Sequence, residues 1–143
     1  MEKQYLLIAE QISFRNNRLT MINVWDQFTA IHSPAKFNFD MAFICGPNWQ
    51  PGEYALTFKV RSSSTEEVFE LGNVKANITN DKAVFNAIAS NVNFVIAQNS
   101  GNVTFVVERN GQEIFEREYP VVYLFELRND QEQQTEDNEP AAV

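Results

Sequence analysis

The side chains that most often act together in catalysis are sparse in this sequence. Asp26, His32 and Ser33 form the only local set with the residue types of a catalytic triad. They fall on one predicted strand and the turn after it, without a nucleophile elbow or a visible oxyanion donor. A strand end at Asp26, a surface imidazole at His32 and a turn at Ser33 and Pro34 explain them better. We therefore predict that the protein is not an enzyme.

Metal ions and cofactors also lack a recognisable site. Cys45 is the single cysteine, and its place in an apolar alternation predicts a buried side chain rather than a reactive thiol. Asn80 and Asp81, with Asp40 elsewhere, supply too few oxygen atoms at a defined spacing for calcium. The five glycines form no phosphate-binding loop. We predict no cofactor and no metal site.

Trp49 lies between Pro47 and Pro51, in a restricted loop between two predicted strands. Aromatic side chains on such loops often anchor a partner, because they bury a large area at a small entropic cost. Pro47, Trp49 and Pro51 are therefore candidate interaction residues, for a protein or for a small ligand such as a carbohydrate. The alternative is that the Trp49 ring folds back and covers the open end of a sandwich.

The segment from Val121 to Leu127 contains six apolar residues in seven. Such a strand left on a sheet edge promotes aggregation unless it is paired or covered. Either it adds to its own sheet, or it adds to the sheet of another chain by strand addition. Tyr123, Leu124 and Phe125 are therefore further candidate interaction residues, and we expect a protein partner or a homo-oligomer.

The formal net charge of −8 is unevenly distributed. Residues 129–143 contain five acidic side chains and no Lys or Arg, whereas the remaining 128 residues have a net charge of −3. We predict a single domain over residues 1–128, followed by a disordered, solubilising acidic tail over 129–143. The body lacks clustered Lys and Arg, so no nucleic-acid partner is expected. No signal peptide or membrane span is expected either, which predicts a cytoplasmic protein that does not bind membranes.

Strand periodicity dominates the sequence. Alternation over Phe37–Cys45 and over Tyr54–Val60 predicts two strands, and we expect them to pair as a hairpin across the Pro- and Gly-rich loop between them. The side chains expected between the sheets are Phe39, Met41, Phe43, Leu56 and Phe58.

Two earlier runs, Gln4–Phe14 and Leu19–Ile31, are separated by the turn cluster at residues 15–18. Bulky side chains on both faces of the second run predict a strand in the centre of its sheet. Residues 83–90 fit either a strand or a short helix. About eight strands with frequent turns predict an antiparallel β-sandwich.

Asn110–Gly111 is the strongest hairpin signal in the sequence. A two-residue turn would place Glu108 opposite Glu113, two like charges. We therefore expect a three-residue loop with a bulge, which places Val107 opposite Phe115 and Val103 opposite Tyr119.

Several short motifs carry a family resemblance. Ala9–Glu10, the run Leu19–Phe28, the run Phe37–Ile44 and Pro51–Tyr54 resemble a family of small bacterial and phage-associated proteins of unknown function. The resemblance covers residues 5–122 and implies an immunoglobulin-like β-sandwich. Trp25 stands where that family more often has Phe, and the resemblance implies no activity.

Three classes of function follow from these observations. A protein-interaction or assembly module is favoured, a small-ligand or carbohydrate binder that uses the Trp49 loop comes second, and an enzyme comes last. Several aromatic residues converging on one concave end would favour the binder, and a flat exposed apolar patch would favour the interaction module.

Overall fold

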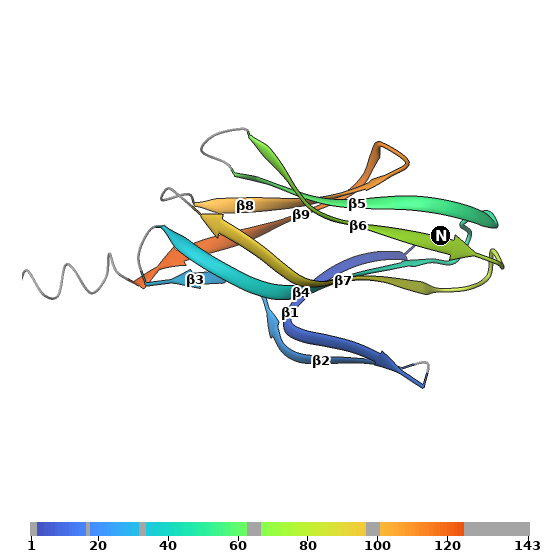
Figure 1. Cartoon of the computed structure of the whole chain (residues 1–143), viewed down its shortest axis with the longest axis horizontal. Coiled ribbons are helices and arrows are strands. Elements are labelled where there is room, and N and C mark those ends of the chain that lie inside the picture. Colours follow the sequence, from blue (N-terminus) through green and yellow to red (C-terminus); the bar gives the residue numbers. More distant parts are fainter. Residues whose placement is uncertain (1–2, 17, 32–33, 63–66, 97–100, 125–143) are drawn as a thin grey trace, which may run out of the picture.

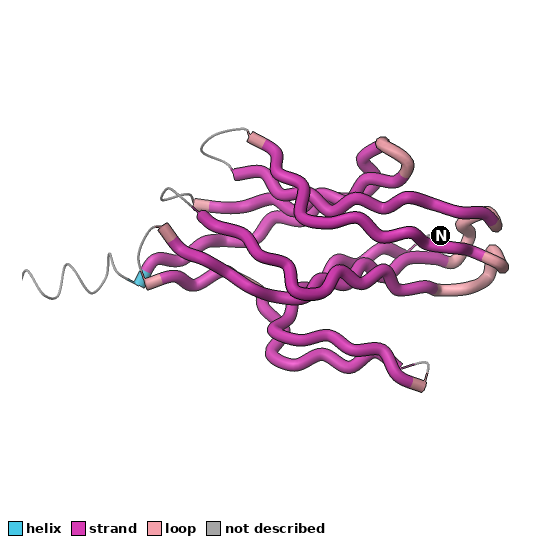
Figure 2. Tube along the Cα trace, in the orientation of Figure 1, coloured by secondary structure: helices cyan, strands magenta, loops and turns pink. Residues whose placement is uncertain are grey.

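The computed structural model describes residues 3–16, 18–31, 34–62, 67–96 and 101–124. These residues form nine strands in two sheets that pack against each other (Figures 1 and 2). The all-β class that the alternating pattern predicts is therefore confirmed, with nine strands rather than about eight.

One sheet has four strands in the order β2-β1-β4-β7. They are β1 (Lys3–Arg15), β2 (Arg18–Trp25), β4 (Ala35–Gly46) and β7 (Phe85–Ile96), and all neighbours pair antiparallel. The distal part of the β1–β2 hairpin leaves this sheet and projects from the sandwich (Figure 1).

The other sheet has five strands in the order β3-β9-β8-β5-β6. They are β3 (Phe28–Ala30), β5 (Gly52–Ser62), β6 (Val68–Ile78), β8 (Asn102–Arg109) and β9 (Gln112–Tyr123). Short β3 runs parallel to the end of β9, so the sandwich is not purely antiparallel as expected.

The predicted core is confirmed. Phe39, Met41, Phe43, Leu56 and Phe58 are all fully buried, which is the outcome of facing strand surfaces whose alternate side chains are apolar. Aromatic rings fill the centre. Phe28, for example, stacks on Phe105 with ring centroids 5.5 Å apart.

The expected hairpin between the second pair of strands is wrong. β4 pairs with β1 and β7, whereas β5 pairs with β6 and β8, so the connection crosses from one sheet to the other. Gly46 makes this corner possible with a φ of +109°, and a Cβ there would lie 2.4 Å from the Ala83 carbonyl oxygen. A period of two shows which face of a strand is buried but not which sheet the strand joins.

The expectation of a central second strand is also wrong. The run Leu19–Ile31 divides into β2 and β3, which lie at edges of different sheets. The partly buried apolar side chains of β2 pack in two places, whereas Ile22 and Val24 are 48% and 55% exposed. Trp25 packs against the main core, whereas Leu19 and Met21 pack against a small second cluster built on Ala9, Ile12 and Ala42.

At the β8–β9 turn, the sequence prediction is right beyond the bulge and wrong at the turn itself. Val107 lies opposite Phe115 and Val103 opposite Tyr119, as expected. The turn has two residues, however, and places Glu108 opposite Glu113 before the register shifts. Neighbouring cations offset the repulsion, because Lys59 lies 2.9 Å from Glu108 and Arg61 lies 3.8 Å from Glu113.

Asp40 fixes the place where the β1–β2 hairpin departs. The β1–β4 pairing ends at Ala9 and Asp40, and opposite Asp40 the β4–β7 register shifts around Asn91, whose φ is +56°. One carboxylate oxygen of Asp40 accepts a hydrogen bond from the Ile12 N–H at 2.8 Å, and the other accepts one from the Asn91 N–H at 2.8 Å. A single side chain of β4 therefore satisfies one backbone N–H on β1 and one on β7 where the regular pairing is interrupted.

Two expectations with open alternatives are decided by the pairing. Residues 85–90 are part of strand β7 rather than a helix. The start of the apolar C-terminal segment adds to its own sheet, because Val121, Val122 and Tyr123 pair with β3. Residues 125–143, including Phe125 and the expected tail, lie outside the described part of the chain.

Replacing Phe43 tests the strand phase. Phe43→Ala is expected to lower the free energy of unfolding by about 3 to 5 kcal/mol, because it removes a buried ring that packs against Phe115 and leaves a cavity. Phe14→Ala is the matched control, since its ring is 49% exposed, and it should cost far less. Urea unfolding of both variants measures the difference, and equal midpoints would contradict the assigned core face.

Removing the Asp40 carboxylate tests the hairpin anchor. Asp40→Ala is expected to cost about 1 to 3 kcal/mol, because the half-buried Ile12 N–H loses its acceptor. Hydrogen exchange at the Ile12 amide should accelerate more than exchange in β5 or β8. Glu118→Ala, which removes an exposed carboxylate of the same charge, is the control. An unchanged Ile12 exchange rate in Asp40→Ala would show that the hairpin does not depend on this contact.

Candidate functional site

Trp49 folds back into the sandwich, which is the second of the two alternatives considered for it. Its side chain is 2% exposed and packs edge-on against Tyr54 and Phe85. The Arg109 guanidinium covers the ring at 4.5 Å from its centroid, and the indole N–H has no hydrogen-bond partner among the described atoms. The ring closes one end of the core and offers no exposed surface to a ligand.

The other candidate interaction residues do not form a common surface with Trp49. Pro47 is half-buried in the turn after β4, and Pro51 is exposed before β5. Tyr123 is 7% exposed at the end of β9, followed by Leu124 at 39%, and Phe125 lies outside the described residues. The structure therefore does not bring the predicted interaction residues together.

The residues considered for catalysis and metal binding are also separate. Asp26 is exposed in the turn after β2, while His32 and Ser33 lie outside the described residues. Cys45 is fully buried, as predicted. Within the described ranges, no group of three or more His, Cys, Asp or Glu side chains could hold a metal ion. Nor does any helix in those ranges have the length and apolar character to cross a membrane.

A shallow hollow lies where the chain passes from β2 to β3. It is lined by Val24, Trp25, Asp26, Gln27 and Thr29. Nearby, the Tyr119 hydroxyl is buried without a hydrogen-bond partner among the described atoms. Burial raises the pKa of Tyr119 above its ordinary value, the Arg117 guanidinium opposes this shift, and the Asp26 carboxylate adds to it.

Arg117 is held at this side of the sandwich by two contacts. Its guanidinium donates a hydrogen bond to the Leu6 carbonyl oxygen at 2.7 Å and lies 4.5 Å from the centroid of the Tyr119 ring. It therefore joins β9 to β1 across the edge of the core. Because both contacts are internal, this cationic group supports the fold rather than presenting itself to a ligand.

The projecting β1–β2 hairpin has one apolar face and one polar face. Cross-strand partners share a face, so Ile12 and Met21 point together toward the second cluster. The opposite side, the outward face, carries three successive cross-strand pairs: Gln11 with Ile22, Ser13 with Thr20, and Arg15 with Arg18. Ser13 is half-buried and the other five are exposed. The polar groups of the outward face are all able to donate hydrogen bonds, and no carboxylate is among them.

Residues 11–25 contain two arginines and no acidic residue, which gives this segment a charge of +2 in a chain of −8. Arg15 and Arg18 lie directly opposite each other at the tip. Like charges in this arrangement destabilise a strand pair. The tip therefore concentrates positive charge at a cost to the isolated fold.

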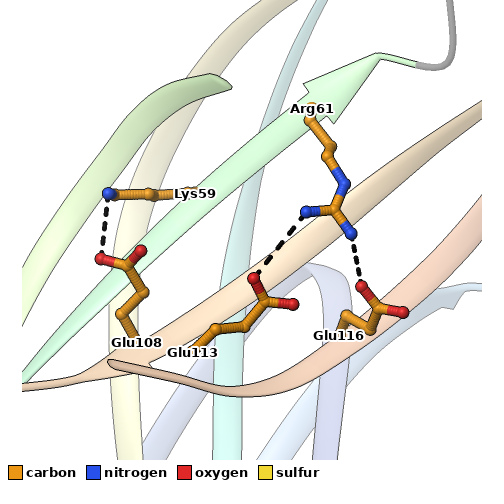
Figure 3. Close-up of polar contacts among 5 residues, drawn as sticks. All are labelled: Lys59, Arg61, Glu108, Glu113 and Glu116. Atoms are coloured by element: carbon orange, nitrogen blue, oxygen red, sulfur yellow. Dashed lines mark hydrogen bonds and ion pairs between the residues drawn. The ribbon is translucent and has the colours of Figure 1, made fainter. Parts of the chain in front are cut away.

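The other described arginines are already engaged within the molecule. Arg61 forms ion pairs with Glu113 and Glu116, while Lys59 pairs with Glu108 on the same surface (Figure 3). Arg109 covers the Trp49 ring, and Arg117 is held as described above. In the part of the chain that the structure describes, Arg15 and Arg18 form no ion pair. Among the described arginines, they are the two that remain available for an anionic ligand.

Sequence reasoning missed the outward face because it treated residues 15–18 only as a turn. The signal that could have revealed it is the stretch of fifteen residues without a carboxylate around two arginines. Whether those arginines share a face depends on the β1–β2 register.

Comparison with known proteins gives little. No family model matches the sequence, and no curated protein matches it significantly. Among solved structures, the chain is similar to Pseudomonas fluorescens alkylpurine DNA glycosylase AlkC bound to DNA containing an abasic site analogue. The identity is 10% and the TM-score 0.43, over 82% of this chain and 30% of that chain.

This finding corrects two expectations. We expected a protein-interaction or assembly module without a nucleic-acid partner, and this expectation is contradicted because the similar structure is of a protein bound to DNA. The carbohydrate-binding alternative is withdrawn with it. A likeness of this extent carries no argument about what this chain binds. The expectation of no nucleic-acid partner rested on the lack of clustered Lys and Arg in the sequence, whereas the β1–β2 register places Arg15 directly opposite Arg18 on a hairpin with a charge of +2.

Tyr119→Phe tests the buried hydroxyl. Because this hydroxyl lacks a described partner, its removal is expected to raise the free energy of unfolding by about 1 kcal/mol at pH 7. The folded-state pKa is raised above about 10, so above that pH the unfolded chain loses a proton that the folded chain keeps. Wild-type stability should therefore fall as pH rises beyond 10, and this component should be absent in Tyr119→Phe.

Urea unfolding at pH 8 and pH 10.5 measures both effects. Tyr5→Phe is the matched control, since that side chain is 53% exposed, and it should follow the wild-type pH dependence. If Tyr119→Phe and wild type lose equal stability between the two pH values, the raised pKa is refuted.

Proposed function

We propose that the protein binds nucleic acid through the outward face of the β1–β2 hairpin. The observation that carries this proposal is the Arg15–Arg18 pair. These two exposed arginines are cross-strand partners at the tip of the projecting β1–β2 hairpin. Guanidinium groups match phosphate oxygens in geometry and charge. A neighbouring phosphate chain would also relieve their mutual repulsion. The hydroxyls of Ser13 and Thr20 add uncharged donors that commonly contact phosphates.

The charge distribution supports contact through the hairpin alone. The rest of the chain is strongly acidic and repels a polyanion, so approach is favoured where residues 11–25 project. The resulting footprint is small. We therefore expect weak binding that depends steeply on salt, as for proteins that contact a few phosphates.

A membrane surface is the other polyanion that an arginine-bearing tip could meet. Insertion would require apolar side chains beside the arginines. On the outward face only Ile22 is apolar, and it lies at the end farthest from the arginines. Phe14 and Leu19 share the opposite face of the ribbon, and Leu19 packs against the second cluster. The donors lie in a row along one face, an arrangement suited to a linear phosphodiester chain.

The test is fluorescence anisotropy with a labelled 20-base-pair DNA duplex over a range of salt concentrations. Removing both guanidiniums in Arg15→Gln/Arg18→Gln is expected to lower affinity about tenfold or more at 50 mM salt. The slope of log K against log salt should flatten by about 1.8, the value for two lost phosphate contacts. The control is Lys75→Gln/Lys82→Gln, which removes the same charge from exposed positions elsewhere and should bind nearly as wild type does.

Circular dichroism and thermal unfolding check that each variant is folded. If wild type fails to bind DNA at low salt, or if both double variants lose affinity equally, the proposal is wrong. Binding to anionic lipid vesicles without binding to DNA would also overturn it, in favour of a membrane contact.

A further inference from the structure

The dimensions of the hairpin point to one form of nucleic acid. The outward face spans five residues on each strand, which is about 17 Å at roughly 3.4 Å per residue. The two strands lie about 4.8 Å apart. The major groove of B-form DNA, about 12 Å wide, admits a two-stranded ribbon of this kind.

The same hairpin does not fit the grooves of double-stranded RNA. The major groove of an A-form helix is deep and too narrow for side chains to read. Its wide minor groove presents 2′-hydroxyls and would be met best by a broad, flat surface rather than by a ribbon. The hairpin therefore selects for a B-form duplex.

The other two pairs of the outward face lie farther from the tip than the arginines, where they would face the edges of the bases. Ile22 is 48% exposed although it is a large aliphatic residue, and its cross-strand partner is the exposed Gln11. Thr20 presents a methyl group in the next cross-strand pair. Aliphatic groups contact the thymine C5 methyl in the major groove, and a glutamine amide pairs with adenine N6 and N7. Each of these side chains complements an A·T pair.

The hairpin is positioned firmly enough to hold such a register. The Asp40 carboxylate accepts a hydrogen bond from the Ile12 N–H, and Leu19 and Met21 pack on the second cluster, so the apolar face of the ribbon is anchored both at its base and near its tip. Asn23, whose φ is +53°, lies at the bend and donates a hydrogen bond from its side chain to Glu10. This bond also holds the carboxylate of Glu10 at the root of the hairpin rather than at the tip.

We propose that the outward face enters the major groove of B-form DNA and favours A·T pairs, with Ile22 against thymine methyl groups. This inference rests on the proposed function. The Arg15–Arg18 pair at the tip then contacts phosphates and holds the ribbon in the groove. Ile22 and Gln11 supply the preference for sequence.

The experiment compares four duplexes of equal length and salt by anisotropy: A·T-rich DNA, the same DNA with uracil in place of thymine, G·C-rich DNA, and an RNA duplex. We expect the A·T-rich DNA to bind most tightly. Loss of the thymine methyl should lower affinity about fourfold, the value for one apolar group removed from water. The RNA duplex should bind least.

Ile22→Ala identifies the contact. This variant is expected to bind thymine and uracil DNA equally, whereas Val95→Ala, which shortens another half-exposed aliphatic side chain on β7, should keep the discrimination. Equal binding of all four duplexes, or discrimination that survives Ile22→Ala, overturns the inference and leaves the proposed function intact. If wild type binds none of them, the proposed function itself fails.

Discussion

One carboxylate sets the place where the β1–β2 hairpin leaves the four-stranded sheet. Asp40 lies on β4 at the point where regular pairing is interrupted on both sides. The pairing of β1 with β4 ends there, and β7 carries an extra residue around Asn91. Without an acceptor at this place, the Ile12 N–H would be partly buried and unpaired, which is costly. By satisfying that N–H and the Asn91 N–H together, Asp40 lets the hairpin turn away from the sheet while its apolar face stays packed.

The departure of the hairpin gives β2 two separate packing sites although the strand lies at a sheet edge. Near Trp25 the strand contributes to the main core, and farther out Leu19 and Met21 cover the second cluster on the same sheet. The chain then passes directly to β3 in the other sheet. The edge strand is therefore held by packing at two places, although within its sheet only β1 pairs with it.

Strand phase could be predicted from the sequence because it depends on neighbouring residues alone. The period of two placed Phe39, Phe43 and Phe58 in the core. The expected bulge gave the β8–β9 register beyond it, although the charge argument against pairing Glu108 with Glu113 was wrong at the turn. Sheet membership could not be predicted, since the corner at Gly46 and the division of the run Leu19–Ile31 depend on long-range packing. The outward face could not be predicted for the same reason. Only the cross-strand register shows that Arg15 and Arg18 lie on one face.

Net charge is a poor guide to the partner of a protein whose ions pair unevenly. On the β5–β8–β9 surface, Lys59 and Arg61 are surrounded by three glutamates, so these cations attract no further anion (Figure 3). On the hairpin, two arginines face each other without a described acidic partner. The repulsion between them weakens the isolated ribbon, and an anion between them would remove it. A like-charge pair that the fold tolerates at an exposed tip is therefore more informative than the sum of all charges.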